Sequence, residues 1–306
     1  MSPNRDHPTA SYYGKPVINP PVWEEREIAG YLFLGGLAGS SSILAAGANL
    51  TGRHCLARRS RLCASAAIGL SLIALVKDLG RPLRFINMLR TFKITSPMSV
   101  GTWIVSAYAA LNFATSASEL TGLLPVAASA TGVGAGLTGA GVATYTAALI
   151  ADTAVPAWHE GYREMPFLFA GSASSAGGGF GLLASPVAEN APAQRMAVAG
   201  AVVELAAEQL LERRLGMIAE TMHEATAGRR LKAAKALTGL GAVGAATLGR
   251  RNRLAAVASG AALLAGSALT RFGIFAAGMA SARDPKYTVE PQRRRLEQRE
   301  RAHVAA

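Results

Sequence analysis

The chain has few of the residues that would hold a redox metal. Its 306 residues include two cysteines and five histidines. Cys55 and Cys63 form no CxxC pair, which argues against an iron–sulfur or zinc site built from this chain. A b-type haem needs facing histidines deep in apolar segments, whereas each histidine here falls in a predicted loop, a tail or a helix end. We therefore expect no haem, no iron–sulfur cluster and no metal ion in this chain.

Charge is also scarce, and apolar residues are grouped in long runs. Charged residues make up 16% of the chain, against ~25% in a soluble domain. A helix that crosses a bilayer needs ~20 mostly apolar residues. Eight runs approach that length: Gly30–Leu50, Leu62–Val76, Met98–Ser118, Leu123–Ile150, Phe167–Ala184, Met196–Leu211, Ala233–Leu248 and Leu254–Ala280. They predict an all-α polytopic membrane protein, a bundle of about eight transmembrane helices.

Polar segments flank this membrane domain and interrupt it once. We expect a polar N-terminal tail over 1–26 without the apolar core of a signal peptide, an eight-helix membrane domain over 27–281, and a basic C-terminal tail over 282–306. The segment from Asp78 to Lys93 is too polar to span a bilayer. Its apolar residues are interspersed with Arg81, Arg84 and Arg90, which predicts an amphipathic interfacial helix between helices 2 and 3.

Lysine and arginine are distributed unequally between the two sides of this predicted topology. Eight crossings place both termini on one side, which holds 22 of the 31 Lys and Arg residues, while the other side holds 8. The positive-inside rule then places both termini in the cytoplasm. Topology also accounts for the net charge of +12 better than nucleic-acid binding does. The alternative, that part of this charge serves a docked partner, stays open.

Several polar side chains lie inside the apolar runs, where they are costly and by default functional. Glu204 and Glu208 share a face of the sixth run, and Arg271 lies deep in the eighth. At ~1.5 Å of rise per residue, Glu208 and Arg271 reach similar depths, so we predict a buried ion pair between them. Its alternative role is packing alone. Four further residues fall in the half of the membrane nearest the termini: Tyr31, Asp78, Tyr145 and Asp152.

Several motifs resemble the NrfD/polysulfide-reductase membrane subunit family. The most specific are Asp78-Leu-Gly-Arg-Pro-Leu-Arg-Phe and Thr95-Ser-Pro-Met-Ser-Val-Gly-Thr-Trp, between the second and third runs. Leu34-Gly-Gly-Leu-Ala-Gly, Tyr162-Arg-Glu-Met-Pro-Phe and Ala282-Arg-Asp-Pro-Lys-Tyr are also similar to it. The resemblance covers essentially the whole chain. It implies an eight-helix, quinone-binding subunit in the inner membrane of a prokaryote.

By this resemblance the chain would bind menaquinone or another quinone and would not be a complete enzyme alone. It would anchor a ferredoxin-like, multi-cluster iron–sulfur subunit and, beyond it, a molybdopterin-type catalytic subunit with molybdenum or tungsten. Tyr145 matches the tyrosine that bonds the quinone in polysulfide-reductase members. Ile28 stands where some members carry an asparagine, so Tyr31, one turn on, would replace that contact. Asp78 would complete the quinone site.

Two further groups of residues receive predicted roles. We assign a proton relay to Asp152, Glu204, Glu208 and Arg271. We assign partner docking to Arg81, Arg84, Arg90 and Glu164, in the loop after the second run and the segment before the fifth.

Two questions stay open at this point. In well-known relatives the face that binds the partner subunit lies outside the cytoplasm, whereas the count of Lys and Arg places the corresponding face of this chain inside. We therefore expect that the quinone site, both termini and the partner share one face, and we leave open which side of the membrane that face is on. The alternative function is a secondary transporter or proton-conducting protein that uses Glu204, Glu208 and Arg271. Transporters built from inverted repeats should show related halves, and the sequence shows no matching halves.

Overall fold

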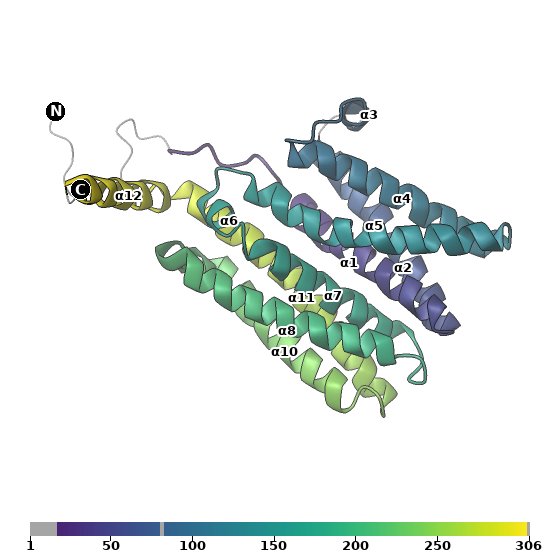
Figure 1. Ribbon diagram of the computed structural model, residues 1–306. Helices are drawn as coiled ribbons and strands as arrows, with labels where there is room; N and C mark the ends of the chain where they lie inside the picture. The colour runs from purple at the N-terminus through teal and green to yellow at the C-terminus, as the bar shows by residue number, and fades with distance from the viewer. Residues whose placement is uncertain (1–16, 80–82, 305–306) are drawn as a thin grey trace.

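The computed structural model describes residues 17–79 and 83–304, and every regular element within them is helical (Figure 1). Eight helices are long: α1 (Glu25–Leu50), α2 (His54–Asp78), α4 (Pro97–Thr121), α5 (Pro125–Ala151), α7 (Met165–Ala184), α8 (Ala191–Leu215), α10 (Ala225–Thr247) and α11 (Arg253–Arg283). Short elements connect them: α3 (Leu83–Leu89), α6 (Pro156–Glu160), the 3₁₀ turn η1 (Gly216–Ala219) and α9 (Glu220–His223). The polar helix α12 (Lys286–Val304) follows α11.

Each predicted apolar run coincides with one long helix, so the predicted all-helical membrane fold is confirmed. Proline occupies the first turn of α4, α5, α7 and α8, a position where its missing N–H costs nothing. The described helices that are long and apolar enough to cross a membrane are α1, α2, α5, α7 and α11. Helices α4, α8 and α10 are long enough to cross but are less apolar. The chain is therefore a multi-pass membrane protein, and the count of eight crossings stays a prediction.

The long helices pack as two groups with the same alternation of directions. The first half contains α1, α2, α4 and α5, and the second contains α7, α8, α10 and α11. Because four long helices precede α7, both halves start from the same end of the bundle and are not inverted relative to each other. Helix α1 packs against members of both halves, including α7 and α11. We call the end where α1 begins and α11 ends the terminal face, and the opposite end the far face.

Glycines set the close approach of α1 to α5. Gly39 and Gly139 face each other, and a Cβ at Gly139 would lie 2.7 Å from the carbonyl oxygen of Gly39. Real Cβ atoms do not approach so closely, so the contact requires glycine. Small residues at helix contacts are the usual device of membrane bundles, where no hydrophobic effect drives helices together.

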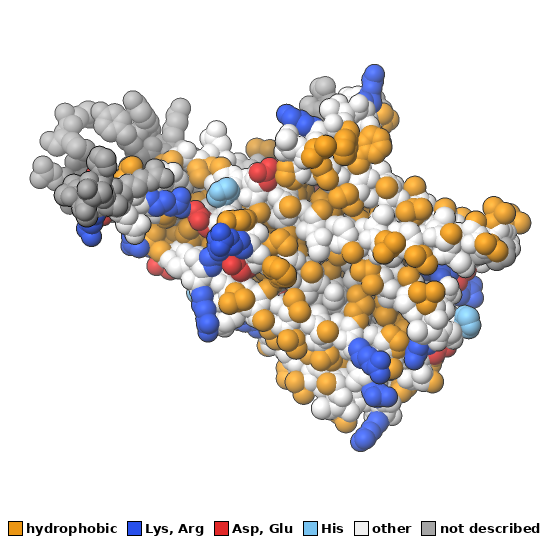
Figure 2. Space-filling model, in the orientation of Figure 1, with side chains coloured by type: hydrophobic (Ala, Val, Ile, Leu, Met, Phe, Trp, Pro, Cys, Tyr) orange, Lys and Arg blue, Asp and Glu red, His pale blue; other side chains and the backbone are white. Residues whose placement is uncertain are grey.

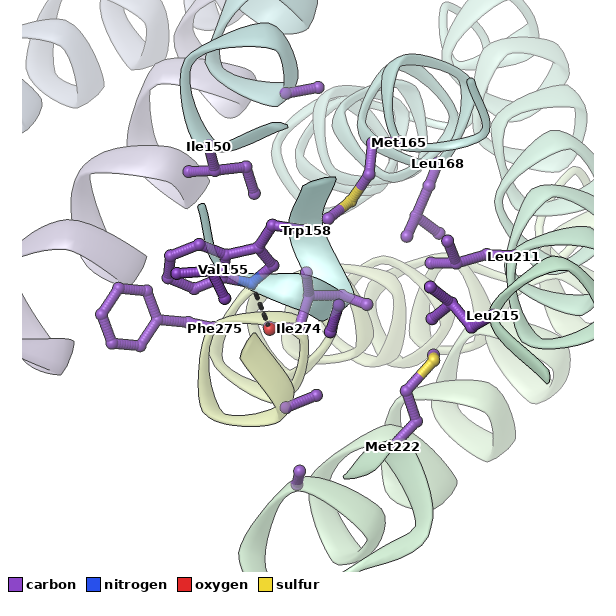
Figure 3. Packing of buried hydrophobic residues seen from close by; sticks show 14 of the residues in the cluster. Ile150, Val155, Trp158, Met165, Leu168, Leu211, Leu215, Met222, Ile274 and Phe275 are labelled. Carbon is purple, nitrogen blue, oxygen red and sulfur yellow. Dashed lines mark hydrogen bonds between the residues drawn. The ribbon is translucent and has the colours of Figure 1, made fainter. Parts of the chain in front are cut away.

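A cluster of large apolar side chains fixes the terminal end of the bundle. Trp158 on α6 is fully buried, and its indole Nε1 donates to the carbonyl of Ile274 on α11 at 2.9 Å (Figure 3). A Cβ at Gly278 would overlap the indole ring. Trp23, just before α1, stacks on Trp158 with ring centroids 6.0 Å apart. The start of α1 is thereby held against α6 and α11.

The surface divides into an apolar middle and charged ends. Figure 2 shows hydrophobic side chains along the flank of the bundle, with Lys and Arg gathered at its two ends. The basic C-terminal tail forms α12, which projects beyond the terminal face (Figure 1). Lys286 bonds Glu220 at 2.7 Å, and this hydrogen bond lowers the pKa of Glu220. Tyr287 donates to Glu224 at 3.0 Å. These contacts attach α12 to the α9 region.

Candidate functional site

A cavity opens between the helices of the first half, at its terminal end. Its volume is about 100 Å³. Polar side chains from four helices border it: Tyr31 of α1, Asp78 of α2, Thr102 of α4 and Tyr145 of α5. Apolar side chains form the rest of the wall: Trp23, Ile28, Leu75, Leu79, Phe85, Met88, Met98, Val105, Leu149 and Ile150. The structure thus brings together the three residues predicted to bind quinone, and their role stays a prediction.

The loop that leads into α4 positions one wall of this cavity. Ser96 caps α4, since its hydroxyl accepts from the backbone N–H of Ser99 at 3.4 Å. The Ser99 hydroxyl donates to the carbonyl of Thr91 and accepts from the N–H of Lys93, both at 3.0 Å. These bonds tie the loop after α3 to the first turn of α4. They give a physical reason for the two serines of the Thr95–Trp103 motif.

Gly101 of the same motif makes room for Tyr145. A Cβ at Gly101 would overlap Cε2 of the Tyr145 ring and lie 2.6 Å from its Cδ2. One edge of the ring therefore lies directly against the backbone of α4 at Gly101, and this contact constrains the orientation of the ring. Thr102, the next residue, borders the cavity, with its hydroxyl donating to the carbonyl of Met98 at 2.8 Å.

We expect Gly101→Ala to displace the Tyr145 ring; with quinone bound in this cavity, as the sequence predicts, quinone turnover should fall severalfold. An added methyl group in a filled site costs ~1–3 kcal/mol of stability, so the thermal midpoint of the purified complex should fall as well. Gly30→Ala is the matched control, because nothing lies within 4 Å of a Cβ built at Gly30. Parental turnover in Gly101→Ala would show that the position of the Tyr145 ring does not matter.

Asp78 and Tyr31 approach the cavity from the helices that frame its mouth. The Asp78 carboxylate accepts from the backbone N–H of Glu24 at 3.3 Å, which links the end of α2 to the start of α1. Tyr31 is buried, and its carbonyl accepts from the hydroxyl of Ser71 on α2 at 3.2 Å. The phenols of Tyr31 and Tyr145 can donate hydrogen bonds to a polar ring in this apolar pocket. The Asp78 carboxylate can accept a hydrogen bond or exchange a proton with such a ring.

None of the residues assigned to a proton relay borders this cavity. Asp152 ends α5 and is exposed. Glu204, Glu208 and Arg271 are buried in the second half, each about 1% exposed. Glu204 accepts from the hydroxyl of Thr270 at 2.8 Å. The structure therefore separates these three groups from the cavity rather than joining them to it.

The predicted ion pair of Arg271 with Glu208 is wrong. Arg271 donates to the carbonyl of Phe169 at 2.7 Å and stacks on the Phe169 ring at 3.6 Å. Within the described residues, the ion pair of Glu208 is with Lys235 of α10, at 3.6 Å, and Lys235 also binds Glu212 at 2.6 Å. Glu204 is the nearby carboxylate, although no ion pair or hydrogen bond joins it to Arg271 within the described residues, and Nε and Nη1 of Arg271 have no hydrogen-bond partner there.

The predicted docking residues lie at the terminal face where the structure describes them. Arg90 is exposed just after α3. Glu164, just before α7, pairs with Arg214 at 3.4 Å. Arg81 and the side chain of Arg84 lie outside the described residues. Helix α3 is formed, and its location at the membrane surface stays a prediction.

The sequence argument missed the groups that complete these sites. Thr102 borders the cavity. Its position next to Gly101 in the Thr95–Trp103 motif was the feature of the sequence that could have indicated this. Glu212 continues the spacing of Glu204 and Glu208 along one face of α8, four residues further on. Tyr108 and Asn112 of α4 belong to a buried hydrogen-bond network. The sequence indicated it only by placing polar residues inside an apolar run.

Comparison with known proteins agrees with this architecture. The family model described as "Polysulphide reductase, NrfD" matches residues 17–281. The chain therefore belongs to the NrfD polysulphide reductase family, and it is a membrane subunit of the kind found in polysulphide reductase-type complexes. A search of the curated proteins found no match.

Proposed function

We propose that this chain is the quinone-reactive membrane anchor of a respiratory oxidoreductase, passing electrons between an iron–sulfur partner subunit and the quinone pool. The observation that carries the proposal is the cavity itself. An apolar pocket with a few convergent polar groups is the usual form of a small-molecule site. Tyr31, Asp78 and Tyr145, singled out from sequence, border this one cavity from three helices.

The residues of the cavity fit a quinone head group. An engineered apolar cavity of ~150 Å³ holds a benzene ring, so a cavity of about 100 Å³ would have to widen through side-chain shifts to take a single quinone ring. The Tyr145 phenol can donate to a ring carbonyl, and Tyr31 adds a second hydroxyl. Asp78, at the mouth, can exchange a proton with water at the terminal face. An isoprenoid tail would leave between apolar side chains into lipid.

The iron–sulfur partner would dock over the same end of the bundle. Electron transfer requires the partner's redox centre to lie near the cavity, and the cavity opens beside α3 and the loop that precedes α4. A molybdopterin-type subunit with molybdenum or tungsten would lie beyond the iron–sulfur subunit and supply the substrate chemistry. The family assignment supports a multi-subunit redox complex.

Purification from native membranes tests the proposal directly. The tagged chain should bring down redox subunits in fixed stoichiometry, with iron and either molybdenum or tungsten in metal analysis, and with bound quinone in the lipid extract. The complex should exchange electrons with an added quinone or quinol. A chain that purifies alone, without redox subunits or quinone, would refute the proposal.

Reversing charge at the docking loop should weaken assembly. We expect Arg81→Glu, Arg84→Glu and Arg90→Glu together to reduce co-purification of the partner, more at low salt than at high salt because salt screens exposed charges. Arg250→Glu with Arg251→Glu, at the exposed turn between α10 and α11 on the far face, is the matched control. If the triple variant retains its partner at low salt, this loop is not the platform.

A further inference from the structure

An apolar groove of about 800 Å³ lies on the flank of the bundle, where α2 of the first half faces α11 of the second half. Helices α1 and α7 complete its walls. One face of α2 follows the groove, because its lining residues recur every three or four positions: Arg59, Leu62, Cys63, Ala66, Ala67 and Leu70. Leu62 and Leu70 are exposed, so the groove opens toward lipid. Among its described lining residues, Arg59 is the one that carries a charge.

The groove extends over about one leaflet of a bilayer. Helix α2 starts at the far face with His54, and the groove follows it from Arg59 to Leu70. That distance is ~16 Å at a rise of ~1.5 Å per residue, against a hydrocarbon core of ~30 Å. A transmembrane helix of a partner needs ~20 residues and would extend beyond this groove. An acyl chain of a lipid in the leaflet at the far face has the matching length and position.

Arg59 is held at the far-face end of the groove by the last turn of α7. Its Nη1 donates to the carbonyl of Ala184, the final residue of that helix, where backbone carbonyls lack partners within the helix. A guanidinium has five N–H donors, and this described bond uses one of them. Arg253 of α11 approaches the same turn and donates to the carbonyls of Leu182 at 2.8 Å and Ser185 at 2.6 Å. Two guanidinium groups therefore meet at the end of α7.

The positive charge of these two groups is not balanced by the protein. The far face carries eight arginines, whereas its glutamates are Glu119 and Glu189. Glu119 pairs with Arg61 at 2.6 Å, and Glu189 accepts from a backbone N–H of α2 at 2.9 Å. Within the part of the chain that the structure describes, neither Arg59 nor Arg253 forms an ion pair. Arginine binds phosphate oxygens through charge-assisted hydrogen bonds, and basic pockets between transmembrane helices bind anionic lipid head groups.

We propose that this groove binds one anionic phospholipid of the leaflet at the far face. Its phosphate accepts hydrogen bonds from Arg59, and one acyl chain lies along the apolar face of α2 as far as Leu70. The lipid then fills the space between α2 and α11 and joins the two halves of the bundle from outside. The inference does not depend on the proposed function, because the quinone-binding cavity borders α2 nearer its other end, at Leu75 and Asp78.

The test measures lipid binding to the purified full chain after its own lipids have been removed in detergent. Native mass spectrometry follows titration with phosphatidylglycerol or with zwitterionic phosphatidylcholine. We expect the parent to bind one phosphatidylglycerol about tenfold more tightly than phosphatidylcholine. Arg59→Gln should lose most of that preference, although its amide can still donate to the Ala184 carbonyl, and Arg59→Lys should keep much of it. Arg58→Gln is the matched control, because Arg58 is exposed on the next position of α2 and lies outside the groove lining.

Two further measurements keep the test decisive if Arg59→Gln fails to fold. Ala66→Phe fills the groove from its exposed side and should weaken phosphatidylglycerol binding by a similar factor. In a Cys55→Ser background, bound phosphatidylglycerol should slow maleimide labelling of Cys63 severalfold, since Cys63 lines the groove.

Three results would overturn the proposal. The first is equal phosphatidylglycerol affinity in the parent and in both Arg59→Gln and Ala66→Phe. The second is equal affinity of the parent for the two lipids. The third is protection of Cys63 in native membranes by another occupant, detected as a cross-link from Cys63 to a partner subunit or as protection by added quinone but not by phosphatidylglycerol.

Discussion

Replacing Tyr145 by Phe should lower quinone turnover by about tenfold or more while the complex still folds and assembles. The substitution removes one hydroxyl and keeps the ring that fills the slot over Gly101. A lost hydrogen bond of ~1.5 kcal/mol in the transition state corresponds to about a tenfold loss of rate. Turnover with an artificial dye at the catalytic partner should stay at the parental level, because dyes bypass the quinone.

The control for this variant is Tyr162→Phe. Tyr162 is 49% exposed beside α7 at the terminal face, and its hydroxyl accepts from Arg163 at 2.9 Å, away from the cavity. Equal quinone turnover in Tyr145→Phe and the parent would make Tyr145 a packing residue and place the quinone elsewhere. Loss of dye activity in Tyr145→Phe would instead indicate a defect in assembly.

Replacing Arg271 by Leu should destabilise the second half of the bundle by ~3–5 kcal/mol, the usual result of leaving a buried charge without its compensating group. Arg271 is 1% exposed, and Glu204, one turn from Glu208 on α8, is equally buried. The described hydrogen bond to the Glu204 carboxylate comes from Thr270, so removal of the guanidinium takes away the nearby positive charge and no hydrogen bond. Thermal unfolding of the purified chain in detergent measures the loss.

Double variants decide which carboxylate depends on Arg271. Arg271→Leu with Glu204→Gln should recover more than half of the lost stability, because the neutral amide no longer needs a cation. Arg271→Leu with Glu208→Gln should recover little, since Glu208 has Lys235 at 3.6 Å. Recovery with Glu208→Gln and not with Glu204→Gln would restore the ion pair expected from sequence and contradict the structural assignment.

The helices could be predicted well from sequence, because bilayer-length apolar runs and the prolines at their starts leave few alternatives. The helical form of the basic tail could not, since α12 has no apolar face to indicate it and is held by contacts such as Lys286 with Glu220. For the cavity, depth along each helix and the family resemblance together singled out Tyr31, Asp78 and Tyr145. The roles of Gly101 and Thr102 could be recognised only from the structure, because they depend on how α4 packs against α5.

The error at Arg271 shows the limit of depth as an argument. Two residues at equal depth can point to different sides of their helices, and rise along an axis says nothing of rotation about it. In addition, α10 begins at Ala225, eight residues before the apolar run that predicted it. Lys235 lies near the start of that run and was not predicted to be the partner of Glu208, whereas the helix carries it into the bundle beside this carboxylate.

The central place of α1 has a consequence for biogenesis. In the most apolar part of α1, 78% of the residues are buried inside the bundle. Arg271 of α11 packs against Gly36 of α1: a Cβ added at Gly36 would lie 3.4 Å from Nη2 of Arg271. The ribosome makes α1 first, and Arg271 follows Gly36 by 235 residues, a delay on the order of ten to fifty seconds at ~5–20 residues per second. During that interval the glycine- and serine-rich surface of α1 faces lipid or an insertion factor. Truncation before α11 should therefore leave a nascent chain that quality-control proteases recognise by its first helix, although that helix itself is intact.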